Sequence, residues 1–336
     1  MNKGRSYKKK KKNNLYLSTP EVFAPETEKT VRAAHRAKMD DNISIDGSYC
    51  FHLPDPTFHR ASQRYTMNLV SAIINIVTAP LAVVTNILVC TAVFSSSRLR
   101  TPSNLFIACL ALSDVFVGLT AQPGYITYRL MENQRRLVPC FVMVMYGASF
   151  YVCFGVSFMT LTAVSYERFV AVRLRVRYNT LFSHSRILKY MLSIWMLNIL
   201  LAALQWAKIN RVARGTHLVV WLICLLVTGL TQFGVVVVVR RNRRQLQVHL
   251  QAAENLQRQT EAKLARSIAF IVVVYTILNF PVLFVTFYHQ ILSRDLQTYN
   301  HYSWTETLAF LNSLSNPVIC LWKNKQIRRK VKDFVL

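Results

Sequence analysis

The sequence predicts an all-α membrane protein, a seven-transmembrane helix bundle with a short amphipathic helix at its C-terminal end. The 336 residues are 52% hydrophobic, and the apolar residues form long blocks that short basic loops separate. One block, 140–172, carries no charge before Glu167 and Arg168. Because about 20 apolar residues suffice for a helix that crosses a bilayer, this block predicts a tilted span.

Seven such blocks are long enough to be spans. In chain order we expect them at 67–94, 104–128, 140–172, 187–206, 216–239, 263–288 and 302–322. Together they form a membrane domain over 66–322. The preceding residues 1–65 are polar and include five consecutive lysines, so we expect a disordered segment without a cleavable signal peptide.

The C-terminal residues 323–336 place Ile327, Val331 and Phe334 at helical spacing among lysines and arginines. This spacing predicts an amphipathic helix on the inner leaflet of a membrane. Basic residues are about three times as frequent in the loops on one side of the membrane as in the loops on the other side. Arg129 is expected in a loop of the side with fewer basic residues. The positive-inside rule then predicts a plasma-membrane protein with its N-terminus outside and its C-terminus in the cytoplasm.

Asn42 begins an Asn-Ile-Ser glycosylation sequon, which agrees with an outside N-terminus. The formal charge of +26 can indicate nucleic-acid binding, but here the basic residues flank apolar spans. We therefore expect contacts with anionic membrane lipids and no nucleic-acid partner. No metal spacing of cysteines and no catalytic motif is present, which predicts that the protein is not an enzyme.

Polar side chains inside spans need partners and are candidate functional residues. The candidates are Asn86, Asp114, Ser157, Asn198, Asn279, Asn312 and Asn316. Asp114 is expected to be the one acid deep in a span, so it should be protonated or hold a cation. Oxygen ligands from Ser157 and Asn312 suit Na⁺. The alternative is hydrogen bonding between helices, worth roughly 0.6 kcal/mol for each bond.

Two prolines inside spans, Pro281 and Pro317, are expected to kink their helices. Arg168 ends the third span, and Glu261 precedes the sixth span on the same side of the membrane. An ion pair between these two side chains would close that end of the bundle, and breaking it would open a cleft.

The ordered motifs resemble those of class A (rhodopsin-like) G-protein-coupled receptors, over about 66–333. The motifs are Thr85-Asn86-Ile87-Leu88-Val89, Leu110-Ala111-Leu112-Ser113-Asp114, Glu167-Arg168-Phe169, Trp195, Phe280-Pro281 and Asn316-Pro317-Val318-Ile319-Cys320. The resemblance implies a receptor that passes an extracellular signal to a heterotrimeric G protein. It also implies that an ion pair between Arg168 and Glu261 holds the inactive state of the receptor. It also implies a sodium-binding polar core of Asn86, Asp114, Ser157, Asn312 and Asn316.

Several positions depart from the pattern of this family. Cys320 replaces its tyrosine, Asn279 replaces a tryptophan, and the fifth span lacks proline and tyrosine. These changes favour, as an alternative, a receptor-like protein that binds ligand but couples poorly to G proteins. The short loop 207–215 has no cysteine, so Cys140 either pairs with Cys50 or both remain thiols. The short loop and the missing proline resemble the melanocortin, lipid and cannabinoid branch.

The resemblance also bears on the ligand, which is an unknown extracellular small molecule, lipid or peptide. Phe150 stands where amine receptors have aspartate, and Phe310 stands where opsins have lysine, which argues against amines and retinal. The candidate pocket wall is Phe150, Tyr151, Phe154, Asn279, Leu283, Glu306 and Phe310, a set that plain helix packing would also give. A transporter is a further alternative, but no internal repeat supports it.

Overall fold

Long α-helices account for nearly all of the chain that the computed structural model describes, namely Cys50 and residues 61–173, 178, 180–205, 210–245, 252–291 and 296–335. These helices are α2 (Ala61–Phe94), α3 (Pro102–Phe116), α4 (Gln122–Asn133), α5 (Cys140–Arg173), α7 (His184–Gln205), α8 (Asn210–Gln245), α9 (Ala252–Ile291), α10 (Leu296–Lys323) and α11 (Lys325–Val335). The predicted disordered segment lies outside the described residues except for Cys50 and the first residues of α2.

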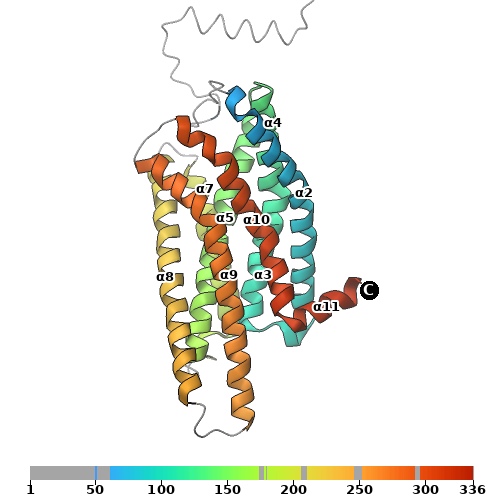
Figure 1. Ribbon diagram of the computed structural model, residues 1–336, viewed down its shortest axis with the longest axis vertical. Coiled ribbons are helices and arrows are strands. Elements are labelled where there is room, and N and C mark those ends of the chain that lie inside the picture. The colour runs from blue at the N-terminus through green and yellow to red at the C-terminus, as the bar shows by residue number, and fades with distance from the viewer. Residues whose placement is uncertain are drawn as a thin grey trace, which may run out of the picture. The chain divides into compact units, whose positions relative to one another are not determined.

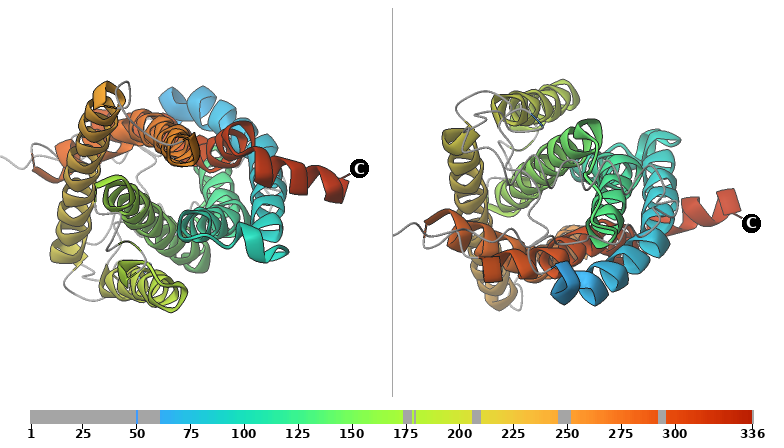
Figure 2. Two further views of the ribbon diagram at one scale, coloured as in Figure 1. Left: turned by 90° about the horizontal axis from the view of Figure 1, so that it is seen from below. Right: turned by 90° about the horizontal axis from the view of Figure 1, so that it is seen from above.

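The helices form one bundle in which α5 is the central element. α5 packs against α3, α4, α7, α8 and α9, and the end-on views show it surrounded by these neighbours (Figure 2). Its inward side chains, such as Phe154, Phe158 and Leu161, are buried. Figure 1 shows α2, α5, α8, α9 and α10 running alongside one another, with α11 turning away where α10 ends.

Six of the described helices are long and apolar enough to cross a membrane, which confirms the prediction of an all-helical membrane bundle for these spans. They cover Arg64–Phe94, Pro102–Asn133, Cys140–Arg173, His184–Leu204, Gly215–Arg240 and Ile268–Tyr288. α10 is not among them, because its middle is rich in serine, threonine and asparagine. The seventh span therefore stays a prediction.

The predicted second span is one helical stretch with a π-helix, η2 (Val117–Ala121), between α3 and α4. Pro123 follows η2, and its ring cannot accommodate a regular turn against the carbonyl group four residues earlier. A π-turn inserts an extra residue and so changes which side chains of α4 point inward. The buried residues of α4 are Gln122, Tyr125, Arg129 and Glu132.

α11 begins directly after α10 because Asn324 caps it. The Oδ1 atom of Asn324 accepts hydrogen bonds from the backbone N–H groups of Gln326 and Ile327, at 3.1 and 3.2 Å. Ile327 and Val331 are buried, whereas Phe334 is 45% exposed and lies beside the Nζ atom of Lys330. The amphipathic pattern thus holds two apolar residues against the bundle, and the contact with a membrane surface stays a prediction.

Gly155 permits the close contact between α5 and α7. A Cβ atom added at Gly155 would lie 1.8 Å from Oδ1 of Asn198, a buried residue whose Nδ2 atom donates to the Ile194 carbonyl at 2.8 Å. We expect Gly155→Ala to lower the stability of the purified protein by about 1–3 kcal/mol, since overpacking has this effect in cores. Thermal unfolding measures the loss.

Gly229→Ala is the matched control, because nothing lies within 4 Å of a Cβ atom added at Gly229. Alanine stabilises a helix interior by roughly 0.5–1 kcal/mol relative to glycine. The control should therefore unfold at the same temperature as the wild type or slightly above it. Equal unfolding temperatures for the two variants would contradict the packing role of Gly155.

Candidate functional site

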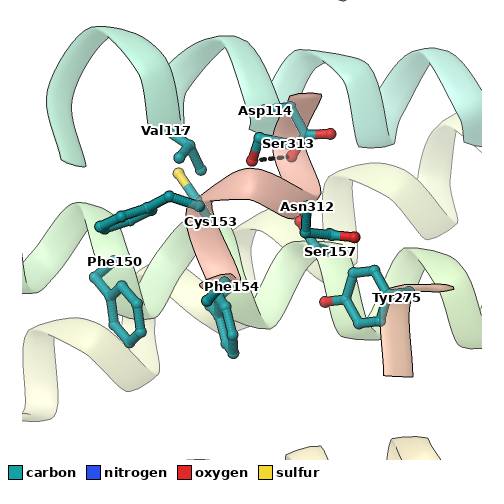
Figure 3. A pocket seen from close by; sticks show the side chains of 11 residues that line it. Asp114, Val117, Phe150, Cys153, Phe154, Ser157, Tyr275, Asn312 and Ser313 are labelled. Carbon is teal, nitrogen blue, oxygen red and sulfur yellow. Dashed lines mark hydrogen bonds between the residues drawn. The ribbon is translucent and has the colours of Figure 1, made fainter. Parts of the chain in front are cut away.

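A buried carboxylate, Asp114 on α3, bonds to two residues of α10 inside the bundle. Its Oδ1 atom accepts a hydrogen bond from the Ser313 hydroxyl at 2.7 Å, and its Oδ2 atom accepts one from Nδ2 of Asn316 at 2.9 Å. Nδ2 of Asn86 donates to the Ser313 carbonyl at 2.8 Å. Figure 3 shows the Asp114 and Ser313 side chains next to each other, joined by the dashed line of this hydrogen bond.

A cavity of about 10 Å³ adjoins this carboxylate, which is roughly the room that one water molecule needs. Oxygen atoms from Asp114, Ser157, Asn312 and Ser313 line it, beside the thiol of Cys153 (Figure 3). Three of the predicted cation ligands therefore share one cavity. Carboxylate, hydroxyl and amide oxygens are the ligands that a hard monovalent cation such as Na⁺ prefers, so this set of donors fits the ion.

Asn316, also a predicted sodium ligand, does not line the cavity that Asp114, Ser157 and Asn312 share. It donates to Asp114 and lines a second cavity of about 20 Å³, together with Asn86 and Cys320. The Oδ1 atoms of Asn86 and Asn316 are buried and have no hydrogen-bond partner among the described residues. A water molecule could satisfy both, since the cavity is large enough for one. Cys320 thus faces a small cavity whose lining is mostly apolar apart from Asn86 and Asn316.

Aromatic rings close the first cavity on the side away from Asp114. The ring centroids of Phe150 and Phe154 are 4.8 Å apart in a stacked arrangement, and Phe310 meets Phe150 edge-on at 5.9 Å. Trp221 of α8 contacts Phe154 at 5.2 Å, and Tyr275 of α9 also lines the cavity. Sequence reasoning missed these last two residues, although a tryptophan inside an apolar span is a recognisable signal.

Only some residues of the predicted pocket wall line this cavity in the structure. Phe150, Phe154 and Phe310 line the cavity with Asp114. Tyr151, Asn279, Leu283 and Glu306 do not line it. Tyr151 stacks on Trp221 with centroids 5.9 Å apart, and Nδ2 of Asn279 donates to the Tyr275 carbonyl at 2.7 Å. The assignment of these four residues to a ligand pocket therefore stays a prediction.

A cluster of buried charges connects the last turns of α4 with the first half of α10 and the start of α2. The Arg129 guanidinium contacts Glu306 at 2.9 Å and Glu132 at 3.3 Å, and Arg64 of α2 contacts Glu132 at 2.8 Å. This cluster corrects two interpretations of the sequence. Arg129 is a buried helix residue rather than part of a loop, and Asp114 is not the only acid inside the bundle. The spacing of Arg129 and Glu132 within one helical turn is the signal that was available.

Arg168 and Glu167 lie at the opposite end of the bundle. The Arg168 guanidinium donates to the Glu167 carboxylate, which also accepts hydrogen bonds from the Tyr178 hydroxyl and, at 2.8 Å, from the Ser103 hydroxyl. Glu167 is completely buried and Arg168 is 7% exposed. The Glu261 side chain, the predicted partner of Arg168, lies outside the described residues.

Tyr178 keeps its proton in this cluster. Burial raises the pKa of its hydroxyl above the ordinary value, and the negative charge of Glu167 raises that pKa further. Tyr178 therefore remains a hydrogen-bond donor throughout the physiological pH range. Phe169, the third residue of the motif, packs against Gly234 of α8, where an added Cβ atom would lie 2.6 Å from its ring.

The remaining predicted residues fall at the bundle ends or inside helices. A disulfide joins Cys50 to Cys140, with Cα atoms 5.2 Å apart, so residues before α2 are tied to the start of α5. Pro281 and Pro317 lie inside α9 and α10. The sequon at Asn42 lies outside the described residues. Cys90, Cys109, Cys153, Cys224 and Cys320 are free cysteines within the helices.

These features define an integral membrane protein whose helices enclose a polar core and end in a buried Glu-Arg cluster. Residues 85–319 match the model of the family described as 7 transmembrane receptor (rhodopsin family). Since the match covers well over half of the chain, the protein belongs to this family. It is a G-protein-coupled receptor and not an enzyme, and receptors of this class act between an extracellular ligand and a heterotrimeric G protein.

Adenosine receptors are among the relatives of the chain. It is 26% identical to adenosine receptor A2b of Rattus norvegicus over 312 residues, and 29% identical to that of Mus musculus over 310 residues. Both alignments cover 79% of this chain and 90% of the relative. These relatives do not support the melanocortin, lipid and cannabinoid branch. That assignment rested on a missing cysteine and a missing proline, and absent residues discriminate poorly between branches.

We expect Glu167→Gln to raise basal G-protein activation several-fold, because the amide carries no charge to hold the Arg168 guanidinium. The measurement is basal G-protein activation in cells at matched surface expression. Ser103→Ala is the control, since it removes one hydrogen bond from Glu167 and leaves the carboxylate in place. Basal activation that is unchanged in Glu167→Gln would contradict the restraining role of this carboxylate.

Proposed function

We propose that this receptor lies in the plasma membrane with its N-terminus outside, and that an extracellular ligand frees Arg168 to admit a G protein at the cytoplasmic end. The observation that carries this proposal is the buried cluster of Arg168, Glu167 and Tyr178. Tyr178 and Ser103 lie outside α5, so a shift of α5 away from them would break their contacts and open the Glu167-Arg168 pair to a partner. The excess of basic residues in the loops of this end supports the orientation.

α10 is proposed as the seventh span despite its polar composition. Its 28 residues correspond to roughly 42 Å at 1.5 Å per residue, which exceeds a hydrocarbon core of about 30 Å. Its polar side chains Thr307, Asn312, Ser313 and Asn316 are buried in the bundle, so they do not meet lipid. α11, with its lysines and arginines, is then proposed to contact anionic lipids of the inner leaflet.

An ion pair of Arg168 with Glu261 of α9 is proposed as a second restraint on the closed state. Kinks at Pro281 and Pro317 would let the ends of α9 and α10 move when this pair breaks. The alternative is a receptor that binds ligand but couples poorly, which Asn279 and Cys320 favour because both replace switch residues of the family. In α9, Asn279 is buried and bonded to its own helix.

A nucleoside is the first class of ligand to examine. The support is the similarity to receptors named for adenosine. Aromatic faces at Phe150, Phe154 and Phe310 suit a flat ring, since stacked and edge-on contacts of such rings are favourable. The present cavity is too small for a nucleoside, so binding would require these rings to separate.

The experiment that tests the function is G-protein activation in cells, with and without adenosine, for the wild type and for Arg168→Ala. We expect a signal in the wild type that the variant loses, because the guanidinium is the proposed contact for the G protein. Arg173→Ala, an exposed arginine near the end of α5, is the control at matched surface expression.

The outcomes separate the candidate functions. A wild-type signal that survives in Arg168→Ala would contradict the role of Arg168. The absence of any signal from the wild type, with or without adenosine, would favour the poorly coupling receptor. A signal that adenosine leaves unchanged would remove the support for a nucleoside ligand.

Na⁺ is proposed to bind in the cavity beside Asp114, with Ser157, Asn312 and Ser313 as the other oxygen donors. Binding to the folded state alone raises stability by RT ln(1 + [L]/Kd), so Na⁺ should raise the unfolding temperature of the receptor by a few °C relative to choline at equal ionic strength. Asp114→Asn should abolish this difference because it removes the anionic ligand. The same Na⁺ effect in both proteins would rule out this site.

A further inference from the structure

The guanidinium of Arg129 lies in a cage of aromatic rings and a carboxylate. Its Cζ atom is 5.0 Å from the centroid of the Tyr125 ring and 5.3 Å from that of Tyr128. One terminal nitrogen donates to Glu306 at 2.9 Å, and the ring of Tyr146 lies 5.9 Å from that of Tyr125, centroid to centroid. Aromatic faces combined with an anion are the groups that recognise organic cations.

This cage lies one helical turn from the aromatic rings of the cavity. Glu306 precedes Phe310 by four residues, and Tyr146 precedes Phe150 by four, so each pair shares a helix face. The Tyr125 ring bridges the two levels, because its centroid is 5.9 Å from that of Tyr146 and 5.4 Å from that of Phe310. The cage therefore adjoins the interior space in which a ligand of this receptor would contact Phe150 and Phe310.

Glu306 depends on Arg129 for a cationic partner, whereas Glu132 has a second one. Arg64 contacts the Oε1 atom of Glu132 at 2.8 Å, so Glu132 would keep a cation if Arg129 were removed. Glu306 is paired with Arg129 alone among the cations of the described residues. Both members of that pair are buried, and a buried carboxylate without a cation is strongly unfavourable. Removing the guanidinium would therefore leave an anionic cage of matching shape.

We propose that this cage is an organic-cation site that the receptor's own Arg129 occupies. In the wild type the tethered guanidinium excludes cationic ligands from the space next to Phe150 and Phe310. Once that side chain is removed, the site takes a small guanidinium ion between Tyr125, Tyr128 and Glu306. The inference concerns the interior of the bundle and does not depend on G-protein coupling through Arg168.

The test is chemical rescue of Arg129→Ala by N-ethylguanidinium, which has the atoms that this substitution deletes. The ion is supplied in the growth medium and during purification of the full-length receptor, and thermal unfolding is measured with and without it. We expect it to raise the unfolding temperature of Arg129→Ala by several °C and to leave the wild type unchanged. N-ethylurea, which has a similar shape and no charge, should have no such effect.

Two variants make the result specific. Arg136→Ala removes an exposed arginine near the same helix end and should show no rescue. Arg129→Ala combined with Glu306→Gln should lose the rescue, because the carboxylate that remains, Glu132, is already paired with Arg64. An equal effect of N-ethylurea, or a rescue that persists in the double variant, would overturn the proposal.

If Arg129→Ala does not reach the cell surface without the ion, surface expression becomes the readout. N-Ethylguanidinium should then increase the surface expression of Arg129→Ala several-fold and leave that of the double variant unchanged. Surface expression of Arg129→Ala that the ion does not alter would overturn the proposal as well.

Discussion

The hydrogen bonds from Ser313 and Asn316 to Asp114 are the interaction on which the interior of the bundle depends. A carboxylate inside an apolar bundle is unfavourable unless hydrogen-bond donors surround it. Each of these two residues donates one hydrogen bond to one of the two carboxylate oxygens. Asn86 then bonds to the carbonyl of Ser313, so α2 is held in register with the same site. The need of Asp114 for donors explains why α10 carries more polar residues than the other spans.

α10 also relates the polar core to the charge cluster beyond it. Glu306 precedes Ser313 by seven residues, two turns of the helix, so both lie on one face. A displacement of α10 at Glu306 would therefore act on the bonds to Asp114. The cluster of Glu167, Arg168 and Tyr178 lies at the other end of α5, whose Ser157 lines the cavity beside Asp114. Two buried charge clusters thus flank one polar core.

The sequence was sufficient for the apolar spans and for the residues around Asp114, because an acid deep inside a span needs the few polar side chains that other spans offer. The sequence was insufficient for contacts that depend on how closely two helices approach each other. Arg129 was assigned to a loop, since the hydropathy of a span ends at its first charges, and its ion pair with Glu306 of α10 was not predicted. The π-helix before Pro123, which turns Arg129 inward, has no signal in periodicity, and only the proline hints at it.

The most direct test of the central claim is an exchange of the Asp114 and Asn316 side chains, with thermal unfolding of the purified receptor as the measurement. Asp114→Asn and Asn316→Asp should each lower the unfolding temperature, because each change removes the pairing of a carboxylate with an amide donor. The double exchange restores that pairing, so it should unfold above the worse of the two single variants. Strictly additive losses in the double variant would contradict the account.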